Sequence, residues 1–219
     1  MKSLAAATSF ACFVALSACS SGGGGSLVAS SPVASSFGTV VGNQLATTLS
    51  NENNGTVSNA AVGTVAYISG LNQTTGQAVT AAGIAGTPTV GPARTTGTAT
   101  YAARYEYDTI INVERNGTVS TRTIGGNRIN RSGAITLNAD FDQGTLRGDA
   151  LFLNVNGTIS GSELGGSVRT TPNIVSTGRT TGELQGQIGA TGVIGAFHGT
   201  ETSFLGNSTV AGGFVGVAN

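Results

Sequence analysis

The sequence predicts an all-β protein: a small eight-stranded antiparallel up-and-down β-barrel, preceded by a lipoprotein signal peptide and a flexible tether. Three observations favour this fold class. From Thr98 onward, apolar and polar residues alternate in short runs, as they do along half-buried strands. Turns rich in glycine and asparagine separate these runs. No segment repeats its apolar residues with the period of a helix.

Residues 1–18 have the form of a secretory signal peptide. One basic residue, Lys2, precedes an apolar run from Leu4 to Leu16 that is too short to span a membrane. The run ends in Leu16-Ser17-Ala18-Cys19, which resembles the bacterial lipobox, whose cysteine receives a lipid after cleavage. We therefore expect Cys19 to be the lipidation site. An ordinary secretory peptide with an incidental cysteine is the alternative.

Charge and cysteine content narrow the function classes. The chain has ten Lys plus Arg and ten Asp plus Glu, and loss of Lys2 with the signal peptide leaves nine and ten, a net charge of about −1. So sparse a charge argues against a nucleic-acid partner and against electrostatic membrane binding. Cys12 lies in the cleaved segment and Cys19 carries lipid, so we expect no disulfide.

A flexible tether is predicted after the anchor. Ser20–Ser36 is rich in glycine and serine, and Phe37–Ser58 has no clean period, so this second stretch is interpreted as loop or weak strand. We therefore divide the chain into a signal peptide (1–18), a lipidated cysteine with tether (19–58) and a folded domain (59–219), which is long enough for a real core.

The first strands of the domain are read from alternation. Val62–Ser69 is rich in β-branched residues and is a candidate first strand. Gly70–Gly97 is interpreted as a long connection whose glycines and prolines forbid a helix. The next strand begins at Thr98, and one of its faces is expected to point into the core; that face carries Ala99, Tyr101, Ala103, Tyr105 and Tyr107.

Hairpins are predicted at several glycine turns. Asn-Gly tolerates the positive φ angles of a type I′ turn, so tight hairpins are expected at Asn116-Gly117 and Asn156-Gly157, with a third at Asn54-Gly55. A turn at Asp142-Gln143-Gly144 divides Ser132–Ala150 into two strands.

The C-terminal segments predict the last strands. Gly182–Gly199 is expected to form a hairpin, and Ser208–Val217 is expected to be the closing strand. A barrel or a sandwich would accommodate about eight such strands. The barrel is favoured because closure removes exposed edges and because small inward residues let the walls approach.

Taken in order, these segments resemble the β-barrel domain of transferrin-binding protein B and its relatives, bacterial surface lipoproteins. The resemblance covers residues 62–219, and its most specific parts are Ala139-Asp140-Phe141 and Gly212-Gly213-Phe214-Val215-Gly216. Where the family has Phe-Tyr-Gly-Pro, this chain has Phe197-His198-Gly199-Thr200. The resemblance implies a barrel on a lipid-anchored surface protein. The chain also departs from the family in having one barrel, where the transferrin receptor has two, each joined to a handle domain for which this chain has no room.

Few residues are candidates for chemistry. His198 is the only histidine, and it is a tentative ligand position; alternation does not decide which face of its strand it occupies. No set of nucleophile, base and orienting group can be assembled around it by spacing, so no catalytic residue is assigned.

The acidic residues predict no metal site. Asp140, Asp142 and Asp149 lack the dense acidic loop of calcium sites and are interpreted as turn residues. Glu106 and Asp108, with Glu163 or Glu183, would form paired carboxylates only if the fold brings them together. No metal and no cofactor are predicted.

Three function hypotheses remain open at this point. The first is a non-enzymatic outer-membrane lipoprotein whose barrel presents loops that bind a protein or small ligand, with iron or haem acquisition as the expected setting. The second is a structural or adhesive envelope module. The third, an integral outer-membrane barrel, is disfavoured because the chain has no tryptophan for an aromatic girdle.

The partners that follow from the first hypothesis are the membrane, through the N-terminal lipid, a host or environmental protein or an iron or haem carrier, and a TonB-type receptor. Whether the protein faces the periplasm or the cell surface is left open.

Overall fold

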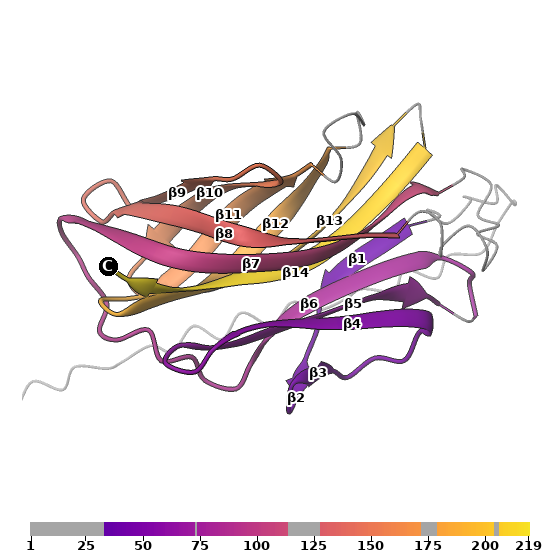
Figure 1. The fold of residues 1–219 in the computed structure, drawn as a ribbon, viewed down its shortest axis with the longest axis horizontal. Helices are drawn as coiled ribbons and strands as arrows, with labels where there is room; N and C mark the ends of the chain where they lie inside the picture. The colour runs from indigo at the N-terminus through magenta and orange to yellow at the C-terminus, as the bar shows by residue number, and fades with distance from the viewer. Residues whose placement is uncertain (1–32, 73, 114–127, 172–178, 204–205) are drawn as a thin grey trace, which may run out of the picture.

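Eight strands form a closed barrel in the computed structural model, which describes residues 33–72, 74–113, 128–171, 179–203 and 206–219 (Figure 1). The strands are β7 (Thr98–Val113), β8 (Arg128–Asp140), β9 (Thr145–Asp149), β10 (Leu153–Ser160), β11 (Glu163–Thr170), β12 (Thr180–Ile188), β13 (Gly192–Ser203) and β14 (Gly206–Ala218). Each is antiparallel to the next in sequence, and β14 pairs with β7 to close the barrel. The predicted fold class is therefore confirmed.

A four-stranded sheet accompanies the barrel. Its strands are β1 (Val33–Phe37), β4 (Ser50–Asn59), β5 (Gly63–Leu71) and β6 (Ala78–Ala85). They lie in the order β1-β6-β5-β4, with β1 parallel to β6 and the other neighbours antiparallel. A short ladder of β2 (Val40–Val41) and β3 (Gln44–Leu45) follows β1. Figure 1 shows the sheet beside the barrel, and β1, β4, β5 and β6 contact β13 or β14.

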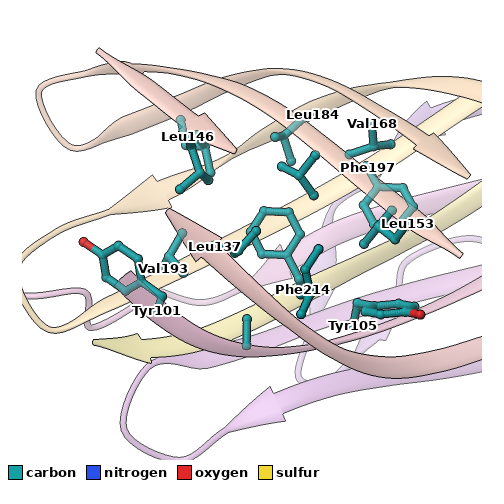
Figure 2. Packing of buried hydrophobic residues seen from close by; sticks show 14 of the residues in the cluster. Tyr101, Tyr105, Leu137, Leu146, Leu153, Val168, Leu184, Val193, Phe197 and Phe214 are labelled. Carbon is teal, nitrogen blue, oxygen red and sulfur yellow. The ribbon is translucent and has the colours of Figure 1, made fainter. Parts of the chain in front are cut away.

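Side chains fill the inside of the barrel. The predicted inward face of β7 is confirmed: Tyr101, Tyr105 and Tyr107 are buried there. Aromatic and aliphatic residues from the other strands meet them at the centre (Figure 2). Those labelled in the figure are Leu137, Leu146, Leu153, Val168, Leu184, Val193, Phe197 and Phe214. The interior is thus a packed core, as expected for a barrel of this strand number.

A second apolar core lies between the sheet and the outside of the barrel. It includes Val57, Val65 and Tyr67 of the sheet, together with outward-facing residues of β13 and β14, among them Ile194 and Val215. Strand β14 therefore has buried side chains on both of its faces from Asn207 to Gly216. Such two-sided burial is unusual for an antiparallel strand, which commonly has one solvated face.

Two glycines allow this close packing. The ring of Phe214 occupies the space where Gly195 would carry a Cβ, inside the barrel. On the outer face, Val65 of β5 occupies the corresponding space at Gly213. Glycine at these two positions lets the side chain of a neighbouring strand rest directly on the backbone.

The sheet corrects the expected layout of the N-terminal half. Residues 33–36, predicted to belong to the flexible tether, form most of β1. Residues 37–58, interpreted as loop or weak strand, contribute to β1–β4, and the connection 70–97 contains β6. Val62–Ser69 does form a strand, β5, but it belongs to the second sheet and not to the barrel. The barrel begins at Thr98, the residue from which the eight predicted strands are counted, and the second sheet was not expected beside it. Alternation was weak in 37–58 because polar residues dominate β4.

The Asn-Gly rule failed where it could be checked. Asn156-Gly157 lies inside β10, which pairs on both sides, and Asn54-Gly55 lies inside β4. Tertiary packing explains the second glycine, since the ring of Tyr67 lies where Gly55 would carry a Cβ. Asn116-Gly117 lies outside the described residues. The turn at 141–144 and the hairpin of β12 and β13 are confirmed.

Packing at Gly195 yields a stability prediction. Gly195→Ala is expected to destabilise the protein by about 1–3 kcal/mol, because the added methyl overlaps the Phe214 ring in a filled core. The control is Gly165→Ala, where the nearest atom to an added Cβ is Thr158 Oγ1 at 3.7 Å. Urea unfolding measures both variants. Equal stability of the two would contradict the packing described.

Candidate functional site

The surface between the sheet and the barrel, here called the sheet–barrel interface, brings together three of the polar side chains that the sequence singled out, Glu106, Asp108 and His198. The side chains of β7 alternate, so its tyrosines point inward while Arg104, Glu106 and Asp108 point outward. Strands β4 and β5 cover the outer side of β7 near Glu106 and Asp108. The fold therefore brings these two acidic residues to the same interface.

Asp108 is a fully buried carboxylate that joins three strands. Its Oδ2 atom accepts hydrogen bonds from Ser69 Oγ at 2.5 Å and from Asn53 Nδ2 at 2.8 Å. The Nε atom of Arg128 lies 3.6 Å from the same oxygen. The other oxygen, Oδ1, accepts no hydrogen bond from the described residues. A buried carboxylate requires such donors and an opposite charge, so Asp108 fixes the position of β4 and β5 on β7.

Arg128 extends this contact to the backbone of the sheet. Its Nη2 atom donates to the carbonyl oxygen of Asn51 at 2.6 Å and to that of Ser69 at 3.2 Å. The guanidinium of β8 thus holds both β4 and β5 through carbonyl groups. Its planar set of donors suits it to contact several acceptors at once.

A second polar group surrounds Glu106. Tyr67 donates its hydroxyl proton to Glu106 Oε1 at 2.5 Å. Asn130 Nδ2 donates to the Tyr67 hydroxyl at 3.1 Å and to Glu106 Oε1 at 3.3 Å. Burial, together with the neighbouring carboxylate that accepts its proton, raises the pKa of Tyr67, so the hydroxyl stays a donor. These contacts orient Glu106 without leaving it free as an acid or base.

A groove, here called the β4 groove, lies beside these contacts. It is lined by Thr56, Val57 and Ser58 of β4 and by residues 104–106 and 132–134 of β7 and β8, and its volume is about 470 Å³. A second hollow of about the same volume shares Thr56 and Glu106 with it and continues toward residues 43–45. The two hollows follow β4 along much of its length.

His198 lies on the outer face of β13, which settles the side that alternation left open. Its Nδ1 atom is 2.9 Å from Ser35 Oγ of β1, a hydrogen bond whose direction depends on the imidazole tautomer. The ring of Phe37 packs edge-on against the imidazole, with centroids 4.3 Å apart. His198 therefore helps to seat β1 on the barrel. Sequence reasoning missed Ser35, because it lay in the predicted tether.

Burial of His198 favours its neutral form. Burial lowers its pKa from 6.5, and the charge of Glu183, its cross-strand neighbour on β12, opposes that shift. A hollow of about 440 Å³ includes Ser35, Glu183 and His198 in its lining. These are the residue types of a hydrolase triad, but no hydrogen bond joins His198 to Glu183 within the described structure. Among the described residues, His198 contacts Ser35 but has no hydrogen bond to the carboxylate that orients the imidazole in such a triad.

Asp140 and Asp142 accept hydrogen bonds from backbone N–H groups at one end of the barrel strands. Asp140 Oδ1 accepts from the backbone N–H of Gln143 at 2.9 Å, and Asp142 Oδ2 accepts from that of Gly97 at 3.1 Å, so both serve the turn. No group of three or more metal-ligating side chains occurs among the described residues. Cys19 lies outside the described residues. No helix in the described part of the chain is long and apolar enough to cross a membrane.

Asp108 provides a test of the interface. Asp108→Ala is expected to lower the free energy of unfolding by about 3 kcal/mol, because it leaves the partly buried charge of Arg128 without its counter-ion. The exposed Asp149 is a matched control, and Asp149→Ala should change stability by less than about 0.5 kcal/mol. Chemical denaturation measures both, and a small effect at Asp108 would contradict its role as the anchor of the sheet.

The lowered pKa of His198 predicts that the free energy of unfolding depends on pH. The folded pKa is lowered, so around and just below pH 6.5 the unfolded chain binds more protons than the folded one. The free energy of unfolding should therefore fall as the pH is lowered from about 7.5 to about 5.5. His198→Asn removes the titrating group and should flatten this slope. Urea unfolding across this range measures it, and identical slopes would overturn the assignment.

Comparison with known proteins leaves the family open. No protein-family model and no curated protein match the chain. Two solved variants of transferrin binding protein B, a vaccine antigen from Haemophilus parasuis Hp5, are similar to it, with 14% identity and a TM-score of 0.41 for one and 13% and 0.42 for the other. Each match covers 76% of this chain but only 37% of that protein. Scores of this size assign no family.

Proposed function

We propose that this chain is a non-enzymatic lipoprotein of the outer membrane that binds a protein partner at the outer surface of its barrel and sheet. The observation that carries the proposal is the filled barrel interior, in which Phe197, Phe214 and their neighbours occupy the centre (Figure 2). Recognition is therefore assigned to the outside of the molecule, where the hollows along β4 and beside His198 lie.

The anchoring part of the proposal depends on Cys19. The apolar run, the small residues at 17 and 18 and the cysteine have the spacing of a lipobox. A lipid on Cys19 would hold the body at the membrane without any spanning segment. Capture of an iron or haem carrier at the cell surface is the setting that the sequence resemblance supports. A structural or adhesive module remains the competing function, and the binding experiment distinguishes the two.

Lipidation is tested by substitution at the cysteines. Cys19→Ala should prevent incorporation of labelled fatty acid and shift the protein from the membrane fraction to the soluble fraction, because the acylated atom is removed. Cys12→Ala is the matched control, since it changes a cysteine in the segment expected to be cleaved, and it should leave anchoring intact. Membrane retention of the Cys19→Ala variant would contradict the anchor.

Partner binding is tested with the soluble body, residues 20–219, immobilised and exposed to serum proteins with and without iron loading. Specific retention of a purified serum protein, confirmed with the isolated components by calorimetry, is the expected result. Retention of none, combined with altered surface attachment and normal iron-limited growth of a deletion strain, would favour the adhesive alternative.

A further inference from the structure

The free edge of β4 has an ordered set of unpaired backbone groups. Strand β4 is the last strand of its sheet, and no other described strand pairs with its outer edge. The carbonyl oxygen of Asn59 accepts the N–H of Val62 in the turn to β5, so the backbone groups of Asn59 face β5. Backbone direction alternates along a strand. The N–H and C=O groups of Asn54, Thr56 and Ser58 therefore face away from β5.

The β4 groove provides room for a strand at this edge. One wall is β4 itself, and the floor is the outer face of β7 and β8. Ser132 and Ala134, the residues of this stretch whose side chains face outward, keep the floor on β8 low because their side chains are small. Exposed Arg104 places a positive charge on the floor, two residues before Glu106 and on the same face of β7.

From Asn53 to Asn59, the edge lacks the charges and prolines that often block strand pairing, and the irregularity of β4 lies before this stretch, between Ser50 and Asn53. Natural sheets protect their edges with lysine, proline, inward charges or a covering element. Between Asn53 and Asn59, β4 has only Asn, Gly, Thr, Val and Ser. The opposite edge strand, β1, is seated on the barrel through the contact of Ser35 with His198. The two edges of the sheet thus differ, and β4 is the unprotected one.

We propose that β4 is a strand-addition site, at which an extended segment of the partner polypeptide pairs with Asn54, Thr56 and Ser58 and places a carboxylate against Arg104. Donors and acceptors that recur at every second residue match the backbone of another strand, whose repeat is the same. Arg104 selects an acidic side chain by charge. This inference rests on the proposed function only for the statement that the natural ligand is a protein.

End-capped synthetic octapeptides of alternating Thr and Val, with Glu, Lys or Ala at one central position, are the probes. Wild-type protein should bind the Glu peptide at least about tenfold more tightly than the Lys peptide, with a dissociation constant below about 1 mM. Arg104→Glu should reverse this preference. Amide hydrogen exchange at Asn54, Thr56 and Ser58 should slow when the Glu peptide is bound.

Thr56→Pro isolates the backbone contribution. Proline removes the outward N–H of Thr56 and is tolerated at the free edge of a sheet, so binding of the Glu peptide should weaken about tenfold, the loss of one or two hydrogen bonds. Thr56→Val keeps the N–H and should bind like the wild type. Unfolding curves of all variants must coincide with the wild-type curve, and Ser58→Pro replaces Thr56→Pro if the latter unfolds.

Three results would overturn the proposal: equal binding of the Thr56→Pro and Thr56→Val variants, no peptide binding by the wild type, or concentration-dependent dimerisation that buries β4 against a second copy. These failures are distinct from failure of the proposed function. If the serum protein binds Thr56→Pro as tightly as it binds Thr56→Val, the strand-addition site is wrong and the proposed protein-binding function stands. If no serum protein is retained, the peptide measurements still decide the nature of the β4 edge.

Discussion

The packing of the sheet on the outer face of β13 and β14 is the interaction on which the rest of the structure depends. A small barrel alone would leave Ile194, Ala211 and Val215 in water, and the sheet alone would leave Val65 and Tyr67 exposed. Each unit buries the apolar face of the other. Gly213 makes the contact close, because Val65 rests where a side chain would stand.

Polar contacts at the margin of this core determine where the sheet sits. Apolar packing is not directional, whereas Asp108 and Glu106 accept hydrogen bonds that Ser69, Asn53 and Tyr67 of the sheet supply in this register. Buried polar groups are costly when unpaired, so a shift of the sheet along β7 would remove the donors of Asp108 and the Tyr67 donor of Glu106. The same polar contacts hold β4 beside the groove that it lines.

The barrel could be predicted from the sequence because its strands alternate between a buried and an exposed face, as β8, β10 and β12 do. The second sheet could not, since β5 is buried on both faces and β4 is polar on most of its length. For the same reason, the hydrogen-bond and ion-pair partners of Glu106, Asp108 and His198 could not be predicted from the sequence. Apart from Arg128 and Asn130 of β8, these partners come from β1, β4 and β5. Long-range packing, which local pattern does not encode, brings those strands to the barrel.

The two-sided burial of β14 has a consequence for cooperativity. Its inner face completes the barrel core through Phe214, and its outer face completes the second core through Val215. Removing this one strand would leave β7 without its barrel neighbour and would also expose the apolar face of the sheet that packs on β14. The two sheets are therefore thermodynamically coupled, and the body should lose its structure in one transition although its strands belong to two separate hydrogen-bonded sheets.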